Sequence, residues 1–171
     1  RALKMFKMVN GEAEQIETSH RLDFPAGKWY TLRIEFTGTT IKAFLDGLEV
    51  YSLIDRDIRD AGAVGMCMNG DSCTHFDDFK YGAFASSVTE TFDNLRAGAP
   101  PPAPWKFGDS PDLARHYPPG NPKWDIYRIR HPRPGTNVLR VSTYGVQPYC
   151  LKADVKISDG YVEEEGKPIM G

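Results

Sequence analysis

The chain has 171 residues, of which 40% are hydrophobic and 26% charged, a composition typical of a globular protein. Its net charge of −2 provides no field that would attract nucleic acid or an anionic membrane, and no run of about 20 apolar residues is present that could insert across a bilayer. The 16 glycines and 13 prolines indicate many turns. We therefore expect a soluble, turn-rich fold with little helix.

Short strands are predicted along the first half of the chain. From Tyr30 to Phe36 apolar and polar residues alternate, which is the period of a half-buried strand. Asp46-Gly47 is a strong hairpin signal, because both central residues of a type I′ turn need a positive φ. Further strands are predicted over Leu3–Met8, Ala13–Thr18, Thr40–Leu45, Leu48–Ile54, Ala63–Met68 and Ser72–Lys80, with hairpin turns at Asn10-Gly11 and Asn69-Gly70-Asp71.

The Pro-rich segment 97–104 divides the chain. Proline lacks the donor that a sheet ladder needs, so this segment is interpreted as an extended linker or wrap. Beyond it, strands are predicted over Trp124–Ile129, Val138–Val141 and Tyr149–Ile157, and a helical turn only over Ser110–His116. In the strand Tyr149–Ile157, the expected inward residues are Leu151, Ala153, Val155 and Ile157. Regular strands with almost no helix predict a β-sandwich or barrel.

Four sequence blocks follow one another in a recognisable order: Gly27–Glu35, Ile41–Gly47, Gly62–Met66 and Thr74–Phe79. They resemble the C-terminal half of laminin-G-like domains of bacterial secreted proteins, in the concanavalin A-like lectin/glucanase superfamily. The resemblance implies an all-β, two-sheet antiparallel jelly-roll sandwich. The superfamily includes 3-keto-disaccharide hydrolase-like domains and many non-catalytic jelly rolls, so the resemblance implies the fold more firmly than an activity.

Residues 105–171 resemble the N-terminal half of such a domain, more weakly, and residues 1–96 the C-terminal half, with 97–104 as the linker. This reversed order indicates either a circular permutation or a chain that spans two tandem half-domains. We expect the two halves to pair into one sandwich, because each alone would leave an apolar sheet face and open edges in water. The blocks that resemble the beginning of such a domain are Thr91–Leu95, just before the linker, and then Trp105, Lys123–Ile126, Asn137–Arg140, Asp159–Glu163 and Lys167–Ile169.

A further strand is predicted around the segment Tyr161–Gly166, and two carboxylates on it are weak candidates for catalysis. Glu163 and Glu165 are two residues apart, so their side chains project from one face at about 7 Å, a spacing that suits an acid and a base on either side of a glycosidic bond. Related glucanases carry a fuller acidic motif, however, and the segment Tyr161–Gly166 lacks its central Asp. A solvated, charged strand end is the favoured interpretation.

His75 and Asp77 are candidate ligand-binding residues, because they share one face of a predicted strand. A neutral imidazole beside a carboxylate could hold a metal or take a proton. The alternative is structural: Asp77 and Asp78 would satisfy backbone donors where the strand bends.

One acidic run, with Asp55, Asp57 and Asp60, offers oxygens to Ca²⁺. Its spacing matches no EF-hand loop, and Arg56 and Arg59 already balance its charge. A solvated surface is therefore preferred, and we predict no metal or other cofactor, with Ca²⁺ as the one weak candidate.

Two aromatic residues form a candidate sugar-binding platform. Phe44 is predicted on the outward side of its strand, and Tyr51 follows on the next strand if the register set by Asp46-Gly47 holds. The apolar face of a pyranose packs well on an exposed aromatic ring. The alternative is that the second sheet, the Pro-rich segment or a neighbouring domain covers both rings.

Three cysteines are too few for a disulfide framework. Cys67 and Cys73 lie symmetrically about Gly70, so in the predicted hairpin they would face each other and could form a disulfide if oxidised.

These features favour a non-catalytic jelly-roll module that binds carbohydrate or a glycan surface. We expect it to be secreted or periplasmic and to contact adjacent domains of a larger parent chain. The alternatives are a glycoside-processing domain that resembles the 3-keto-disaccharide hydrolases, and a structural spacer. An enzyme needs a cleft with convergent carboxylates, a binding module needs an exposed aromatic, and a spacer needs neither.

Overall fold

The structure is a computed structural model of the chain, and it describes residues 4–9, 12–18, 22, 25–67, 73–109, 123–129, 136–142 and 148–170. Every regular element in this part is a β-strand, which confirms the all-β prediction. The described residues include no helix that could span a bilayer. The strands are β1 (Lys4–Val9), β2 (Glu12–Thr18), β3 (Tyr30–Thr37), β4 (Thr40–Leu45), β5 (Leu48–Ile54), β6 (Gly62–Cys67), β7 (Cys73–Ala83), β8 (Ser86–Glu90), β9 (Trp105–Asp109), β10 (Lys123–Arg128), β11 (Asn137–Ser142), β12 (Pro148–Ile157) and β13 (Gly160–Met170).

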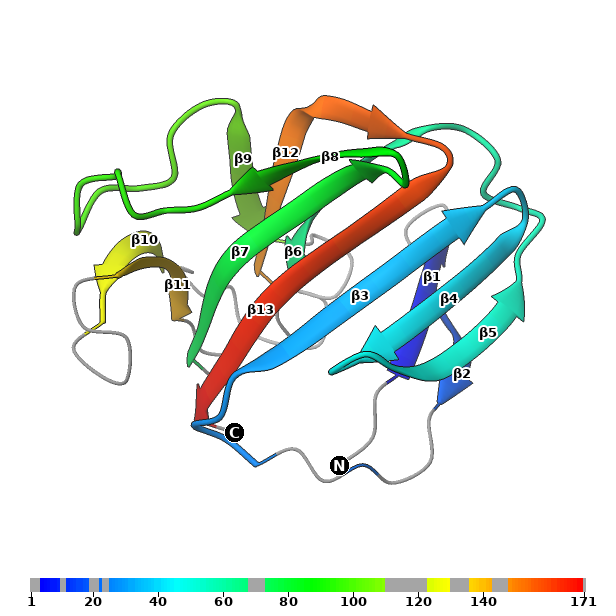
Figure 1. Cartoon of the computed structure of the whole chain (residues 1–171), viewed down its shortest axis with the longest axis horizontal. Coiled ribbons are helices and arrows are strands. Elements are labelled where there is room, and N and C mark those ends of the chain that lie inside the picture. Colours follow the sequence, from blue (N-terminus) through cyan, green and yellow to red (C-terminus); the bar gives the residue numbers. More distant parts are fainter. Residues whose placement is uncertain are drawn as a thin grey trace.

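Two antiparallel sheets pack into a β-sandwich, with the hairpin β1–β2 beside them (Figure 1). The large sheet has eight strands in the order β10-β11-β7-β13-β3-β4-β5, and β8 pairs with β7 off this path. The small sheet has the order β6-β12-β9. We call the side of the large sheet that is turned away from the small sheet its outer face, and the other side its inner face.

The last strand lies in the middle of the large sheet, between β3 and β7 (Figure 1). Its register pairs Glu163 with Arg33 on one side and with Lys80 on the other. Strand β12 likewise pairs with β6, which precedes the Pro-rich segment. Both sheets are therefore built from strands that precede and strands that follow the Pro-rich segment.

The Pro-rich segment is fixed to the sandwich by backbone hydrogen bonds. Gly98 N–H donates to the Ile126 carbonyl at 2.7 Å, and Ile126 N–H donates to the Ala99 carbonyl at 2.8 Å. Trp105, directly after the segment, is buried against Phe79 and Phe92. The predicted helical turn over Ser110–His116 falls outside the described residues.

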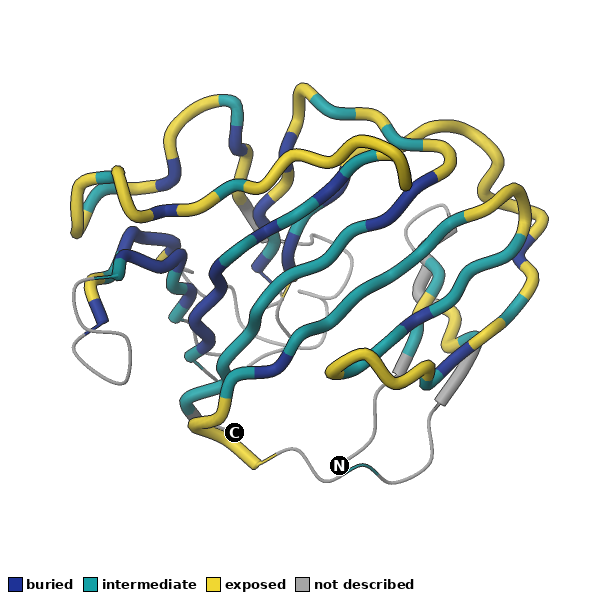
Figure 2. Tube along the Cα trace, in the orientation of Figure 1, coloured by how far each residue is buried: buried dark blue, intermediate teal, exposed yellow. Residues whose placement is uncertain are grey.

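The main core lies between the small sheet and one half of the large sheet. Figure 2 shows the buried backbone concentrated in β7, β10 and β11, whereas β3, β4 and much of β13 are of intermediate exposure. Trp105 and Trp124 are both core residues. Burial of large aromatic side chains dominates the stability of such a core. The cluster comprises Val64, Met66, Phe76, Phe79, Tyr81, Phe92, Trp105, Trp124, Ile126, Leu139, Val141 and Cys150.

Two predicted hairpins are confirmed and one is wrong. Strands β1 and β2 pair, and β4 and β5 pair across the Asp46-Gly47 turn, where both residues have a positive φ. Strands β6 and β7, however, belong to different sheets, so the chain passes from one sheet to the other between them. Cys67 and Cys73 are consequently not cross-strand partners, and both are free thiols. The turn residues 68–72 themselves lie outside the described residues.

The predicted inward face of β12 is also wrong over its first half. Cys150 is fully buried and Lys152 is 7% exposed, whereas Leu151 is 36% exposed. An irregularity in the pairing with β6 between Lys152 and Ile157 changes the phase of the strand, and Ile157 then packs against the core. A bulge of this kind reverses the sides of all residues beyond it, so strict alternation fails as a guide.

Candidate functional site

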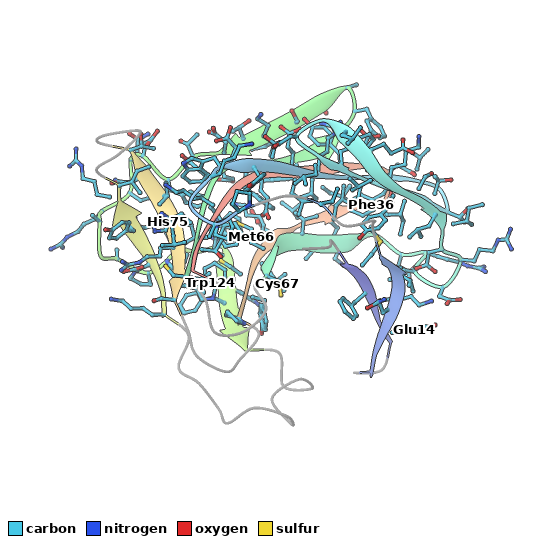
Figure 3. The ribbon with its side chains drawn as sticks, turned by 90° about the horizontal axis from the view of Figure 1, so that it is seen from below. Glu14, Phe36, Met66, Cys67, His75 and Trp124 are labelled. Carbon is cyan, nitrogen blue, oxygen red and sulfur yellow. The ribbon has the colours of Figure 1, made fainter. Side chains whose placement is uncertain are left out.

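The register of β3 and β13 places a row of polar side chains on the outer face of the large sheet. Arg33 lies opposite Glu163, and Glu35 lies opposite Tyr161. The alternate residues, such as Val162, pack on the inner side against the core. Side chains stand along this outer surface when the sheet is seen edge-on (Figure 3). The period of two residues along each strand thus separates a charged face from an apolar one.

Four charged residues, Glu35, Arg33, Glu163 and Lys80, form a continuous ion-pair network across β3, β13 and β7. Arg33 donates from Nη1 to Glu163 Oε2 at 3.2 Å, and Lys80 Nζ donates to Glu163 Oε1 at 2.9 Å. Arg33 also donates from Nε to Glu35 Oε1 at 2.8 Å, and its guanidinium lies 3.7 Å from the Tyr161 ring centroid. The contacts with Glu163, Glu35 and the Tyr161 ring together fix the orientation of the Arg33 guanidinium.

The pKa of Glu163 reflects its position in this network. Burial alone would raise the pKa of its carboxyl group, but the hydrogen bonds from Lys80 and Arg33 outweigh burial and lower the pKa below its ordinary value. Glu163 is therefore ionised at neutral pH and acts as an acceptor of hydrogen bonds.

An open depression of about 490 Å³ lies beside this network on the outer face. At one end the Asp46-Gly47 turn closes it, and Asp46 is fixed there because Thr31 N–H donates to its Oδ1 at 2.8 Å while the Asp46 N–H donates to the Thr31 carbonyl. We call this feature the Arg33 depression; it is lined by Thr31, Arg33, Glu35, Phe44, Asp46, Gly47 and Glu163.

Of the two predicted platform aromatics, only Phe44 lines the depression. Tyr51 pairs with Ala43 and is 7% exposed, because a register irregularity between Ala43 and Phe44 places it on the inner face. The two rings therefore do not form the continuous outward platform that an unbroken register would produce. Phe44 is the aromatic residue of the depression.

Glu163 and Glu165 share the outer face, as the two-residue spacing predicts. Glu163 lines the depression, whereas Glu165 lies further along β13, opposite Asp77 of β7. The lowered pKa of Glu163 does not suit a general acid, which needs a carboxyl group that holds its proton near neutral pH.

His75 and Asp77 lie on β7 at the other end of the outer face, away from the Arg33 depression. Asp77 Oδ1 accepts the backbone N–H of Asp78, whose φ of 47° marks an irregularity in the pairing with β13. This contact agrees with the predicted structural role of Asp77 at a bend.

A second group of polar residues surrounds His75; we call Asp125, Tyr127, Arg140 and His75 the Asp125 cluster. Arg140 donates to Asp125 from Nε at 2.8 Å and from Nη2 at 2.6 Å. The Tyr127 ring lies against both the Arg140 guanidinium and the His75 ring. Burial, together with Arg140 and Lys167, lowers the pKa of His75 to about 4 against the opposing effect of Asp125. His75 is therefore neutral at pH 7.

The acidic run that was considered for Ca²⁺ is engaged in other contacts. Lys7 Nζ lies 2.6 Å from Asp57 Oδ2 and 3.8 Å from Asp55 Oδ1. Among the described residues, no group of three or more His, Cys, Asp or Glu side chains is arranged to hold a metal ion.

Sequence reasoning missed three residues that define the site and its surroundings. The alternation of apolar and polar residues identified Arg33 and Lys80 only as polar residues of predicted strands. Their ion pairs with Glu163 could not be predicted, because Glu163 is distant in the sequence. Glu164 projects to the inner face, where burial raises its pKa to about 8. The alternation of Val162, Glu164 and Gly166 on one side was the available signal for its orientation.

No protein-family model matches this chain, and no curated protein matches its sequence.

Proposed function

We propose that this chain is a non-catalytic β-sandwich module that binds carbohydrate in the Arg33 depression. The observation that supports this best is the combination of a guanidinium, three carboxylates and an aromatic ring around one open depression. Adjacent sugar hydroxyls both donate and accept hydrogen bonds, so they suit a lining of planar charged groups. The apolar face of the same sugar ring can pack against Phe44.

The ion pairs leave part of the lining available to a ligand. Among the described residues, Arg33 uses Nε and Nη1 and Glu35 uses Oε1 in the network. Arg33 Nη2 and Glu35 Oε2 remain to contact hydroxyl groups. Because Glu163, Glu35 and the Tyr161 ring already orient the guanidinium, little side-chain entropy is lost when a sugar binds.

The rival function is a glycoside-processing domain, which needs a proton-donating carboxyl group beside the sugar. The depression does not offer one at Glu163, whose pKa is lowered. The carboxyl group with a raised pKa, Glu164, lies on the inner face of the same strand. This separation favours binding over hydrolysis. A pure spacer is disfavoured because it has no need for an open, charged depression.

The antiparallel sandwich and the resemblance of the sequence blocks to laminin-G-like domains support a finer assignment. We infer a concanavalin A-like jelly roll in which residues 105–171 and 1–96 supply the two halves. A module of this kind would act in the secreted or periplasmic space, attached to adjacent domains of its parent protein. The sheet order, with β13 between β3 and β7, is the structural support for joining the halves.

A glycan-array screen of the purified chain tests the proposal, with Phe44→Ala and Arg33→Ala as variants. We expect the chain to bind at least one class of glycan. The affinity should fall at least tenfold in each variant, because the stacking on Phe44 and the hydrogen bonds from Arg33 should each contribute more than about 1.4 kcal/mol to binding. Binding should be the same with Ca²⁺ and with a chelator.

Phe107→Ala is the matched control, because Phe107 is an aromatic residue that is 46% exposed on the small sheet. It should bind like the unsubstituted chain. Binding that survives both depression variants, or release of cleaved sugar from a bound glycan, would contradict the proposal.

A further inference from the structure

An exposed aromatic residue lies on the outer face, outside the lining of the Arg33 depression. Phe84 is in the turn between β7 and β8, and it is 54% exposed. This turn lies beside the start of β13, where Gly82 pairs with Tyr161 (Figure 1). The ring centroids of Phe84 and Tyr161 are 6.2 Å apart, and the two ring planes meet at 30°. Tyr161 is on the outer face, because it is two residues from Glu163 in an unbroken register with β3. Phe84 therefore adds exposed aromatic surface to this face.

Tyr161 connects Phe84 to the Arg33 depression. Tyr161 is itself buried, and the Arg33 guanidinium lies 3.7 Å from the centroid of its ring. Arg33 lines the depression and pairs across the strands with Phe44 of β4. We call Phe84, Tyr161, Arg33 and Phe44 the outer-face row. An isolated exposed phenylalanine would need no explanation, but this one continues a row of contacts that ends in the candidate site.

The two ends of the outer-face row are too far apart for one sugar ring. Phe84 follows β7 and Phe44 is on β4, so three strand spacings, about 14 Å, separate them across the sheet. Polar groups lie between them. Glu35, opposite Tyr161, uses only Oε1 among the described contacts, and Lys80 donates to Glu163 with one of its three N–H groups. Two exposed rings separated by such groups suit a chain of sugars, because its rings can stack while its hydroxyl groups form hydrogen bonds.

We propose that Phe84 forms a second stacking subsite, and that the ligand of this face is a linear oligosaccharide that runs from Phe44 across Arg33 to Phe84. This inference rests on the proposed carbohydrate function of the Arg33 depression. A short sugar fills the depression alone, whereas a longer chain also stacks on Phe84. Phe84 thus makes the module select for the length of the glycan.

Calorimetric titration of the full chain with β-1,4-linked disaccharides and hexasaccharides of glucose, mannose and N-acetylglucosamine tests the proposal. For the sugar that binds, the hexasaccharide should bind at least tenfold more tightly than the disaccharide. Phe84→Ala should remove most of this advantage and leave the affinity for the disaccharide unchanged. Phe44→Ala should weaken both ligands. Phe107→Ala removes a similarly exposed phenylalanine from the small sheet and should change neither affinity.

Two further measurements separate a stacking subsite from an indirect effect through Tyr161. Phe84→Trp should keep the advantage of the longer sugar, because it retains a ring at this position. In the unsubstituted chain, nuclear Overhauser contacts to the Phe84 ring should appear with the hexasaccharide and be absent with the disaccharide.

The proposal is overturned if the hexasaccharide binds no more tightly than the disaccharide, if Phe84→Ala keeps the advantage, or if it weakens both ligands equally. Disaccharide binding that depends on Phe44, without any effect of length, would still support the carbohydrate function and contradict only the second subsite. No binding of any of the sugars would contradict both.

Discussion

The two ends of the outer face carry the same kinds of side chain in different surroundings. At one end, the Asp125 cluster buries its carboxylate, which is 4% exposed, in a two-bond contact with Arg140. At the other end, Arg33 and Glu163 pair beside an open depression and keep 27% and 19% of their side chains exposed. The two arginines are similarly exposed, 24% for Arg140 and 27% for Arg33, so the burial of the acid distinguishes a pair that fixes the structure from one that can offer a ligand surface.

Breaking the buried pair is expected to have the largest effect on stability. Asp125→Ala should lower the free energy of unfolding by about 2–4 kcal/mol, because it leaves the Arg140 guanidinium without its buried partner. Denaturant unfolding measures this. Glu49→Ala, which removes an exposed pair with Lys42, should cost less than about 1 kcal/mol. If the two variants were equally stable, the distinction between buried and exposed pairs would fail.

The pH dependence of stability tests the burial of the Asp125 cluster through His75. Its folded pKa of about 4 is below the ordinary value of 6.5, so between these values the unfolded chain binds the extra proton. His75 should stabilise the fold fully above pH 6.5, and this contribution, about 1–3 kcal/mol, should be lost as the pH falls from 6.5 to 4.

Titration of Glu164 has the opposite effect on the free energy of unfolding. Its pKa is raised from 4.5 to about 8, so between these pH values the folded chain binds the extra proton, and Glu164 stabilises the fold as the pH falls. Unfolding should therefore be compared between the unsubstituted chain and His75→Gln across pH 4–8. The loss toward low pH should be smaller in the variant. A difference between the two curves that does not change with pH would refute the neutral, buried state of His75.

The smallest effect on stability is expected in the open region. Glu163→Gln should lower the free energy of unfolding by no more than about 1 kcal/mol at pH 7, because Lys80 and Arg33 can be resolvated. The difference should disappear as the pH falls below 4.5, where the carboxylate of the unsubstituted chain also loses its charge. Chemical denaturation at pH 7 and pH 3 measures both values. A loss as large as that of Asp125→Ala would mean that Glu163 is structural.

Local patterns predicted the strands well but not which strands pair. Alternation and the Asp46-Gly47 turn located β4 and β5 with the bounds that the structure has. The same kind of signal failed at Asn69-Gly70, because a turn sequence does not specify whether the next strand returns to the same sheet. The β13 strand was visible, but its position between β3 and β7 depends on long-range packing.

The candidate site was predictable in its residue types and not in its assembly. Phe44 and Glu163 were both singled out from the sequence, and the structure brings them to one depression. Tyr51 does not line the depression, because a register irregularity beside Phe44 places the Tyr51 side chain on the opposite face of the sheet. Arg33 was missed because its role comes from a contact with a residue 130 positions away.

Nuclear magnetic resonance mapping of a sugar titration tests the central proposal most directly. The isotope-labelled chain would be titrated with glucose-, mannose- and galactose-based oligosaccharides, and backbone amide shifts would be recorded. The account predicts that the shifts concentrate at Thr31, Arg33, Phe44 and Glu163 and leave His75 and Arg140 unchanged. Shifts confined to the Asp125 cluster or to the small sheet would contradict it, as would no shift with any of the sugars.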